Sequence, residues 1–197
     1  MKIISFEGIE GVGKSTQINL LKDYLENKSY KVEVYREPGS TVASEKIRDI
    51  LLDNEIDLSN ETELLLMFAA RSELVAKKIN KSDCDFLLLD RFYDASLAYQ
   101  GYGRNLSIEF INNLIEFINC PKPNNSFLLD ISVKDGFSRK INDKKDRIES
   151  SGDDFFNKVR DGYLKIAEIE KDRFTVIDAS KEIDIISKEI ISAIDIQ

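Results

Sequence analysis

The sequence contains no histidine, only two cysteines and no long hydrophobic run. Without histidine the chain cannot build a Ser-His-Asp triad or a Cys-His pair, so acid–base chemistry falls to carboxylates and lysines. Cys84 and Cys120 lack the spacing of a zinc or redox motif and are expected to be free thiols. No apolar stretch approaches the roughly 20 residues of a membrane span, and no signal-peptide pattern opens the chain. We therefore expect a cytoplasmic protein without a membrane partner.

Positive charge is also scarce. The 197 residues include 28 Lys and Arg against 36 Asp and Glu, which gives a formal net charge of −8. A large basic surface for a nucleic-acid backbone is not expected at this charge, and cations with a function should be clustered locally. The length and the apolar content predict one domain, residues 1–197, around a single core.

Short apolar runs rich in branched residues alternate with longer stretches of helical periodicity. The predicted strands are residues 2–7, 31–36, 85–89, 126–130 and 174–178. The predicted helices are residues 14–27, 42–52, 61–80, 108–119, 133–140, 155–171 and 181–194. This alternation predicts an α/β fold with an open, mostly parallel sheet of about five strands and helices on both faces. Ligands of such folds bind beyond the carboxyl ends of the strands.

The first strand is followed by a glycine-rich segment. Residues 8–15, GIEGVGKS, fit the pattern G-x-x-x-x-G-K-[ST] completely. Glycines allow several backbone N–H groups to converge on a phosphate chain, Lys14 supplies a cation for the β- and γ-phosphates, and Ser15 supplies a ligand for Mg²⁺. A phosphate-binding loop is therefore predicted. The residues assigned to the nucleotide here are Gly8, Ile9, Glu10, Gly11, Val12, Gly13, Lys14, Ser15 and Thr16.

Charged residues at three strand ends leave two interpretations open. Glu10 next to a triphosphate is unfavourable unless it faces a substrate hydroxyl or hydrated Mg²⁺, and a solvated loop acid is the alternative. Asp90 ends a buried strand, where it can organise Mg²⁺ while Arg91 binds phosphate, and a strand-end salt bridge is the alternative. Residues 36–39, REPG, form a turn that either has a function or is only a turn.

Two helical segments combine residue types that suit a nucleobase, which requires a ring for stacking and polar groups at its edge. These residues are Phe68, Ala69, Ala70 and Arg71 on one helix and Ser96, Tyr99 and Gln100 on another. Taken alone, the aromatic residues would more often belong to the core.

A cluster of cations lies in the most polar part of the chain. It consists of Arg139, Lys140, Lys144, Lys145 and Arg147. A solvated charge run is the ordinary interpretation, and residues 142–154 look like a mobile surface loop. The functional interpretation is a lid, about residues 139–154, that closes over the phosphates and excludes water.

The ordered set of motifs resembles the thymidylate kinase family of bacterial type over nearly the whole chain. The motifs are FEGIEGVGKSTQ, REPGST, LLLMFAARSELV, LLLDRFYDASLAYQGYG, DRIES and VIDAS. The resemblance implies a P-loop fold like that of nucleoside monophosphate kinases and direct in-line transfer of a phosphoryl group from ATP to dTMP with Mg²⁺. It also implies a homodimer. The alternatives kept open are another nucleoside or nucleotide kinase, for example for dUMP or thymidine, and a P-loop regulatory NTPase.

The resemblance also implies roles for individual residues. Phe68 is similar to the residue that stacks on thymine, Arg71 and Gln100 to those that read its edge, and Ser96 and Tyr99 to those near the sugar and the 5-methyl group. Arg36, Arg48 and Arg91 resemble the arginines around the dTMP phosphate. Glu37 and Asp90 resemble acids that organise Mg²⁺ and substrate, Pro38 belongs to the same substrate turn, and Glu10 resembles the acid that meets the 3′-hydroxyl or the metal shell.

One position separates two types within this family. Some members carry an arginine where this chain has Gly11, and members without it place the catalytic cation in the lid. This chain resembles the lid type, so Arg139 is assigned to the nucleotide and Arg147, in the DRIES segment, is the first choice for the catalytic cation. The predicted catalytic residues are Lys14, Glu10, Arg91 and Arg147.

Overall fold

The computed structural model describes residues 1–140 and 145–194. Its strands are β1 (Lys2–Glu7), β2 (Val32–Arg36), β3 (Phe86–Asp90), β4 (Asn125–Asp130) and β5 (Phe174–Asp178). Its α-helices are α1 (Lys14–Asn27), α2 (Val42–Leu52), α3 (Asn60–Lys77), α4 (Tyr93–Ser96), α5 (Ile108–Phe117), α6 (Val133–Ser138), α7 (Asp153–Ile169) and α8 (Ile183–Ser192). A π-helix (Leu97–Gly103) continues α4, and short 3₁₀ turns lie at Ile79–Lys81 and Glu149–Ser151.

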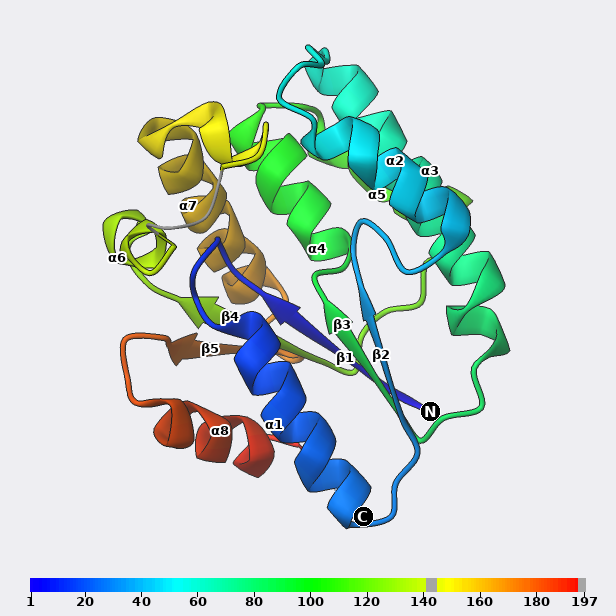
Figure 1. The fold of residues 1–197 in the computed structure, drawn as a ribbon, viewed down its shortest axis with the longest axis vertical. Coiled ribbons are helices and arrows are strands. Elements are labelled where there is room, and N and C mark those ends of the chain that lie inside the picture. Colours follow the sequence, from blue (N-terminus) through cyan, green and yellow to red (C-terminus); the bar gives the residue numbers. More distant parts are fainter. Residues whose placement is uncertain (141–144, 195–197) are drawn as a thin grey trace.

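The strands form one parallel sheet in the order β2-β3-β1-β4-β5. The central strands β1, β3 and β4 are nearly continuous apolar runs, as expected for strands that are covered on both faces. Because all strands are parallel, their carboxyl ends meet at one edge of the sheet, where the segments after β1, β2 and β3 come together (Figure 1). The predicted α/β fold is confirmed.

Helices cover the two faces of the sheet. The helices α1 and α8 pack side by side on one face, where the Gln17 side chain donates a hydrogen bond to the carbonyl of Ile183 (Figure 1). On the other face α7 packs along the π-helix and reaches β4 and β5. None of the described helices is both long and apolar enough to cross a membrane.

Side-chain caps explain where several helices begin. The hydroxyls of Thr41, Ser59, Ser107 and Ser132 each accept a hydrogen bond from a backbone N–H in the first turn of α2, α3, α5 and α6. Such caps satisfy N–H groups that have no partner within the helix. At the start of α6 the N–H of Asp135 donates to Ser132 Oγ at 3.1 Å.

The structure differs from the sequence-based prediction at several element boundaries and in two segments. The strands β1 and β5 have the predicted bounds, β2, β3 and β4 shift by one residue at one or both ends, and β3 includes Asp90. The helix predicted at 61–80 ends at Lys77, and the helical segment 93–103 was missing from the predicted helices although Ser96, Tyr99 and Gln100 were expected on a helix. The prediction of a surface loop at 142–154 is wrong for residues 145–154. Ile148 is buried, and the N–H of Arg147 donates to the carbonyl of Leu52.

Candidate active site

A cavity of about 460 Å³ opens at the carboxyl ends of β1, β2 and β3. This volume lies in the range of small-molecule sites. The predicted residues that line it are Glu10, Gly11, Gly13, Lys14, Ser15, Thr16, Arg36, Glu37, Pro38, Arg48, Arg71, Asp90, Arg91, Ser96, Tyr99, Gln100 and Arg139. The structure thus brings together residues from five separate sequence motifs around one space.

The glycine-rich loop turns around the ammonium group of Lys14. Lys14 Nζ donates to the carbonyl of Ile9 at 2.9 Å and to that of Gly8 at 3.1 Å. Burial, followed by repulsion from Arg91, lowers the pKa of Lys14 to about 8. The loop therefore holds a buried cation that an incoming phosphate would stabilise in its charged form. Ile9 and Val12 pack in the core behind the loop and do not face the cavity.

Side-chain oxygens of Ser15, Asp90 and Glu37 line the cavity and are of the kind that a metal ion binds. Ser15 Oγ donates to Asp90 Oδ2 at 3.1 Å, which joins the start of α1 to the end of β3. Oε1 of the buried Glu37 has no hydrogen-bond partner among the described residues. Those residues contain no group of three or more metal-ligating side chains. Such a set suits Mg²⁺, which keeps several waters and takes few protein ligands besides phosphate oxygens.

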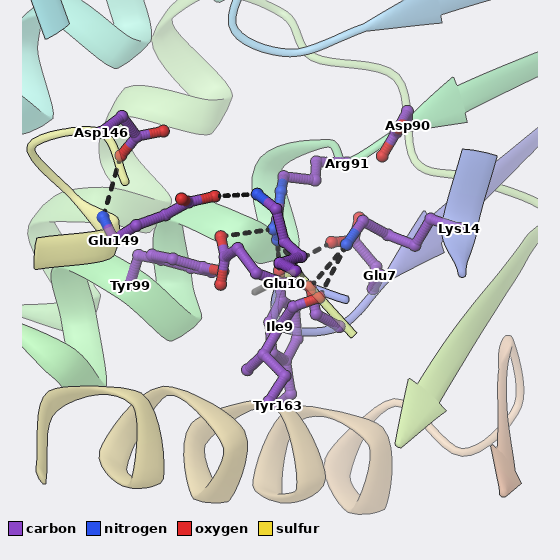
Figure 2. A network of polar contacts seen from close by, with 12 residues as sticks. Glu7, Ile9, Glu10, Lys14, Asp90, Arg91, Tyr99, Asp146, Glu149 and Tyr163 are labelled. Carbon is purple, nitrogen blue, oxygen red and sulfur yellow. Dashed lines mark hydrogen bonds and ion pairs between the residues drawn. The ribbon is translucent and has the colours of Figure 1, made fainter. Parts of the chain in front are cut away.

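Glu10 is held by two partners across the cavity. Arg91 Nη2 lies 2.8 Å from Glu10 Oε1, and the hydroxyl of Tyr99 donates to Oε1 at 2.8 Å and approaches Oε2 at 3.0 Å (Figure 2). Arg91 also donates to the carbonyl of Gly8 at 2.7 Å and adopts a φ of 67°. Residues other than glycine rarely adopt this conformation. The turn after β3 therefore fixes the direction of this guanidinium group. The interpretation of Glu10 as a freely solvated acid is wrong.

A second carboxylate near Arg91, that of Glu7, was missed by the sequence analysis. Glu7 is completely buried and accepts hydrogen bonds from the N–H of Phe92 at 2.9 Å and from the Tyr163 hydroxyl at 3.1 Å (Figure 2). Burial, followed by the charge of Asp94, raises the pKa of Glu7 to about 8. Its place at the end of β1, directly before the glycine-rich loop, is the signal that could have marked it.

Arg71 forms one wall of the cavity and is held there by hydrogen bonds. It donates to Glu37 Oε2 at 2.7 Å and to Ser96 Oγ at 3.0 Å. The ring of Phe68 lies 4.7 Å from its guanidinium carbon and is buried behind it. The prediction that Phe68 faces the ligand is therefore wrong. The side chain that lines the cavity from this part of α3 is Met67, which the sequence analysis did not select.

Three arginines converge at the end of the cavity near β2 and β3. Arg48 donates to the carbonyl of Pro38 at 2.8 Å, and Arg36 pairs with Glu45 at 2.8 Å. Burial, followed by repulsion from Arg36, lowers the pKa of Arg48. With Arg91, these side chains make this end positive, which suits a phosphate dianion.

The cations of the predicted lid divide into two groups. Arg139, which donates to the carbonyl of Ala179 at 3.0 Å, and Lys140, which pairs with Glu149, line the cavity. Arg147 instead donates to Glu63 Oε2 at 2.8 Å and lines a separate depression, because the buried acid Glu63, 84 residues earlier in the chain, holds it there. Its role as the catalytic cation stays a prediction.

Lys145, a further lid candidate, does not line the cavity. Lys145 Nζ lies 5.2 Å from the ring of Phe137, and Lys144 falls outside the described residues. The lining residues that the sequence analysis did not single out are Leu52, Met67, Ala95, Asp146, Ile148 and Glu149.

Comparison with known proteins identifies the family. The model of the family described as thymidylate kinase matches residues 6–190. The chain belongs to the thymidylate kinase family. It is 44% identical to a thymidylate kinase of Thermosipho africanus over 98% of this chain and 96% of that protein. It is 45% identical to a thymidylate kinase of Ruthia magnifica over 96% of this chain and 95% of that protein.

A solved structure agrees with the fold of this thymidylate kinase family member. The crystal structure of thymidylate kinase from Ehrlichia chaffeensis superposes with a TM-score of 0.79, at 31% identity, and the match covers 97% of this chain and 96% of that one. The family resemblance inferred from the motifs, the P-loop fold and the class of enzyme, a nucleoside monophosphate kinase, are confirmed. A kinase of this family uses a nucleotide and a metal.

Proposed function

We propose that this member of the thymidylate kinase family transfers the terminal phosphoryl group of ATP directly to the phosphate of dTMP, with Mg²⁺ bound. The observation that carries the proposal is the single cavity that Lys14 and the arginines Arg36, Arg48 and Arg91 share. One end is built for a phosphate chain and the other for a second phosphate. Phosphoryl transfer requires both groups in line and little covalent chemistry from the protein.

The donor side consists of the glycine-rich loop. The N–H groups of residues 11–16 and the N-terminus of α1 favour the β- and γ-phosphates, and Lys14 exchanges its carbonyl partners for phosphate oxygens. Ser15 and Asp90 would hold Mg²⁺, and Oε1 of Glu37, which has no partner among the described residues, is a further acceptor for a substrate group. The metal supplies charge neutralisation of the transferred group.

The acceptor side consists of the arginines and the wall formed by Arg71. Arg36, Arg48 and Arg91 bind the dTMP phosphate, while Glu10 receives the 3′-hydroxyl between its two partners. The dTMP phosphate is already anionic, so no strong general base is needed. This is consistent with the absence of histidine.

The base lies between Met67, Arg71 and Gln100. Met67 replaces Phe68 as the side chain that contacts the face of thymine, because it lines the cavity while Phe68 packs behind Arg71. A thioether is polarisable and makes favourable contacts with aromatic rings. Ser96 is occupied by Arg71, so we place Tyr99 next to the sugar and Ser96 behind the base-reading guanidinium.

One assay tests the proposal. Formation of ADP is measured in a coupled assay with ATP and Mg²⁺ and a panel of acceptors, namely dTMP, dUMP, dCMP, dAMP and thymidine. We expect ADP release that depends on dTMP. Lys14→Ala, with a far-UV spectrum like that of the wild type, should abolish it because the charge on the β- and γ-phosphates loses its partner.

Two results would overturn the proposal. ADP release that is slow and independent of every acceptor would indicate a regulatory NTPase, and faster turnover of thymidine than of dTMP would indicate a nucleoside kinase. The homodimer, the single domain and the cytoplasmic location stay predictions. Light scattering of the purified protein tests the homodimer.

A further inference from the structure

Glu63 is a buried acid at the base end of the cavity that no motif of the sequence pointed to. It lies on α3, eight residues before Arg71, and is 1% exposed. It does not itself line the cavity, but its carboxylate contacts a residue that does. Burying a carboxylate lowers the stability of a protein unless its oxygens accept hydrogen bonds or pair with cations.

Three donor residues from two segments, the π-helix with its C-terminal residue and the segment around Arg147, surround this carboxylate. Gln100 Nε2 donates to Oε1 at 3.0 Å, Arg104 Nη2 donates to Oε2 at 3.2 Å, and Arg147 Nη2 donates to Oε2 at 2.8 Å. Burial alone would raise the pKa of Glu63, but the hydrogen bonds from Arg104, Gln100 and Arg147 hold it below its usual value. The group is therefore a carboxylate at neutral pH, and it can only accept hydrogen bonds.

An acceptor-only neighbour decides which way the amide of Gln100 is turned. An amide has a donating nitrogen and an accepting oxygen that are nearly interchangeable in shape, and the surrounding hydrogen bonds select the orientation. Beside the carboxylate of Glu63 the nitrogen must face the acid, because the oxygen would be repelled. Gln100, which lines the cavity, is thereby left with its carbonyl oxygen free to accept.

Pyrimidine bases differ at the edge that such a group reads. The ring nitrogen N3 of thymine carries a hydrogen and donates, whereas N3 of cytosine accepts. A fixed acceptor therefore favours thymine and repels cytosine, while an amide free to turn could satisfy either base. Sites that hold a hydrogen-bonding group in one orientation discriminate strongly, because the wrong partner leaves a buried polar group unpaired.

We propose that Glu63 is a positioning residue that sets the base specificity of this enzyme, by holding the Gln100 amide with its oxygen toward the base. The proposal rests on the proposed dTMP kinase activity. Glu63 acts through Gln100 and touches neither substrate nor the transferred phosphoryl group. The same carboxylate anchors Arg147, so the segment that contributes Asp146 to the cavity wall is held by the group that orients the base reader.

The test is the ratio of kcat/KM for dTMP to kcat/KM for dCMP in Glu63→Gln. This variant keeps the shape of the side chain and removes the charge that fixes the amide. We expect the ratio to fall tenfold or more, through a higher KM for dTMP and a measurable activity with dCMP, while kcat for dTMP changes less. The double variant Glu63→Gln/Gln100→Glu returns an obligate acceptor to the cavity and should recover preference for dTMP over dCMP.

A matched control separates orientation of the amide from docking of the segment around residue 151. Arg104 Nη2 also donates to Ser151 Oγ at 2.9 Å, so Ser151→Ala loosens that segment and leaves Glu63 with all three partners. We expect its dTMP/dCMP ratio to equal that of the wild type. Melting temperatures of all variants report any common loss of stability.

The outcomes are distinct. A lower melting temperature of Glu63→Gln with an unchanged dTMP/dCMP ratio would show that Glu63 is structural only and would overturn the inference. A changed ratio that the double variant does not recover would also overturn it, because the amide orientation would then not be the cause. A wild-type enzyme that does not turn over dTMP would instead reject the proposed function, before any variant is compared.

Discussion

Gly11 of the glycine-rich loop and Gly136 of α6 touch through their backbones: a Cβ atom on Gly11 would lie 1.9 Å from the carbonyl oxygen of Gly136. Gly11 also has a φ of 74°, which side chains rarely adopt. Position 11 therefore has no room for any side chain while α6 packs here. The packing of α6 against Gly11 brings Arg139, the residue directly after α6, to the cavity.

Replacing Gly11 by alanine should displace α6 and weaken catalysis. The methyl group cannot coexist with the carbonyl of Gly136, so we expect Gly11→Ala to lower kcat for dTMP at least tenfold. Stability should also fall, by about 1–2 kcal/mol from the left-handed backbone alone. Steady-state kinetics and chemical denaturation measure the two effects separately.

Gly152 offers a matched control for backbone strain. It has a φ of 87°, and a Cβ atom there would meet nothing within 4 Å. Gly152→Ala should therefore cost about 1–3 kcal/mol of stability, as other strained backbones do, with kcat near that of the wild type. Equal kcat values in the two variants would contradict a role for the contact between Gly11 and α6.

The neighbours Met67 and Phe68 should respond differently to substitution. Met67 lines the cavity, whereas Phe68 packs under Arg71 and is 3% exposed. We expect Met67→Ala to raise KM for dTMP about tenfold with little change in stability. Phe68→Leu should lower stability by about 1–2 kcal/mol, the range of core substitutions that change shape. Titration with dTMP and thermal melts check both.

Phe68→Leu also serves as the control for Met67→Ala. A larger rise of KM in Phe68→Leu than in Met67→Ala would return the base-contacting role to Phe68. Met67→Phe, which keeps a large apolar side chain in the cavity, should bind dTMP better than Met67→Ala.

Local patterns predicted the strands and the phosphate-binding loop well. The apolar run of β1, the glycines after it and Lys14 at the start of α1 are all neighbours in the sequence, so spacing alone fixes their chemistry. The same holds for Asp90 and Arg91, because parallel strands bring their carboxyl ends to one edge.

Predictions failed where the position of a side chain depends on which way it points from its helix or on a partner far away in the sequence. Consecutive residues of a helix point about 100° apart, so residue type marked Phe68 while the axis of α3 turned Met67 to the cavity. Arg147 carried the right charge, but its partner Glu63 lies 84 residues away and no local signal reveals it. The π-helix Leu97–Gly103 contains two glycines, which argue against a helix, and tertiary packing on α7 overrides them.

Glu7 should make the stability of the protein depend on pH. Its pKa rises from an ordinary 4.5 to about 8 on folding, so the protonated acid stabilises the fold. This contribution is complete below about pH 4.5 and is lost as the pH rises toward 8. In Glu7→Gln no proton titrates at this position. The fall in unfolding free energy from pH 5 to pH 8 should therefore be smaller than in the wild type, by more than about 1.4 kcal/mol, the value of one pKa unit.

Chemical denaturation at both pH values measures this difference. Glu26→Gln is the control, since Glu26 is an exposed acid paired with Lys22 on α1. It should show the same pH dependence as the wild type, because exposed ion pairs contribute little. An identical pH dependence in Glu7→Gln and the wild type would contradict a raised pKa of Glu7.

The cation that stabilises the transferred phosphoryl group should be found at the start of the lid. The glycine-rich loop offers no arginine at Gly11, while Arg139 and Lys140 line the cavity and Arg147 is bound to Glu63. A cation that meets the transition state is worth on the order of 10³-fold in kcat, and a solvated charge is worth almost nothing. We expect Arg139→Gln to lower kcat about 10²-fold or more, with KM for dTMP little changed. Arg147→Gln should reduce stability more than kcat, because it breaks a buried pair. The reverse order of the two kcat values would show that the lid rearranges during catalysis to bring Arg147 over the phosphates, and it would restore Arg147 as the catalytic cation.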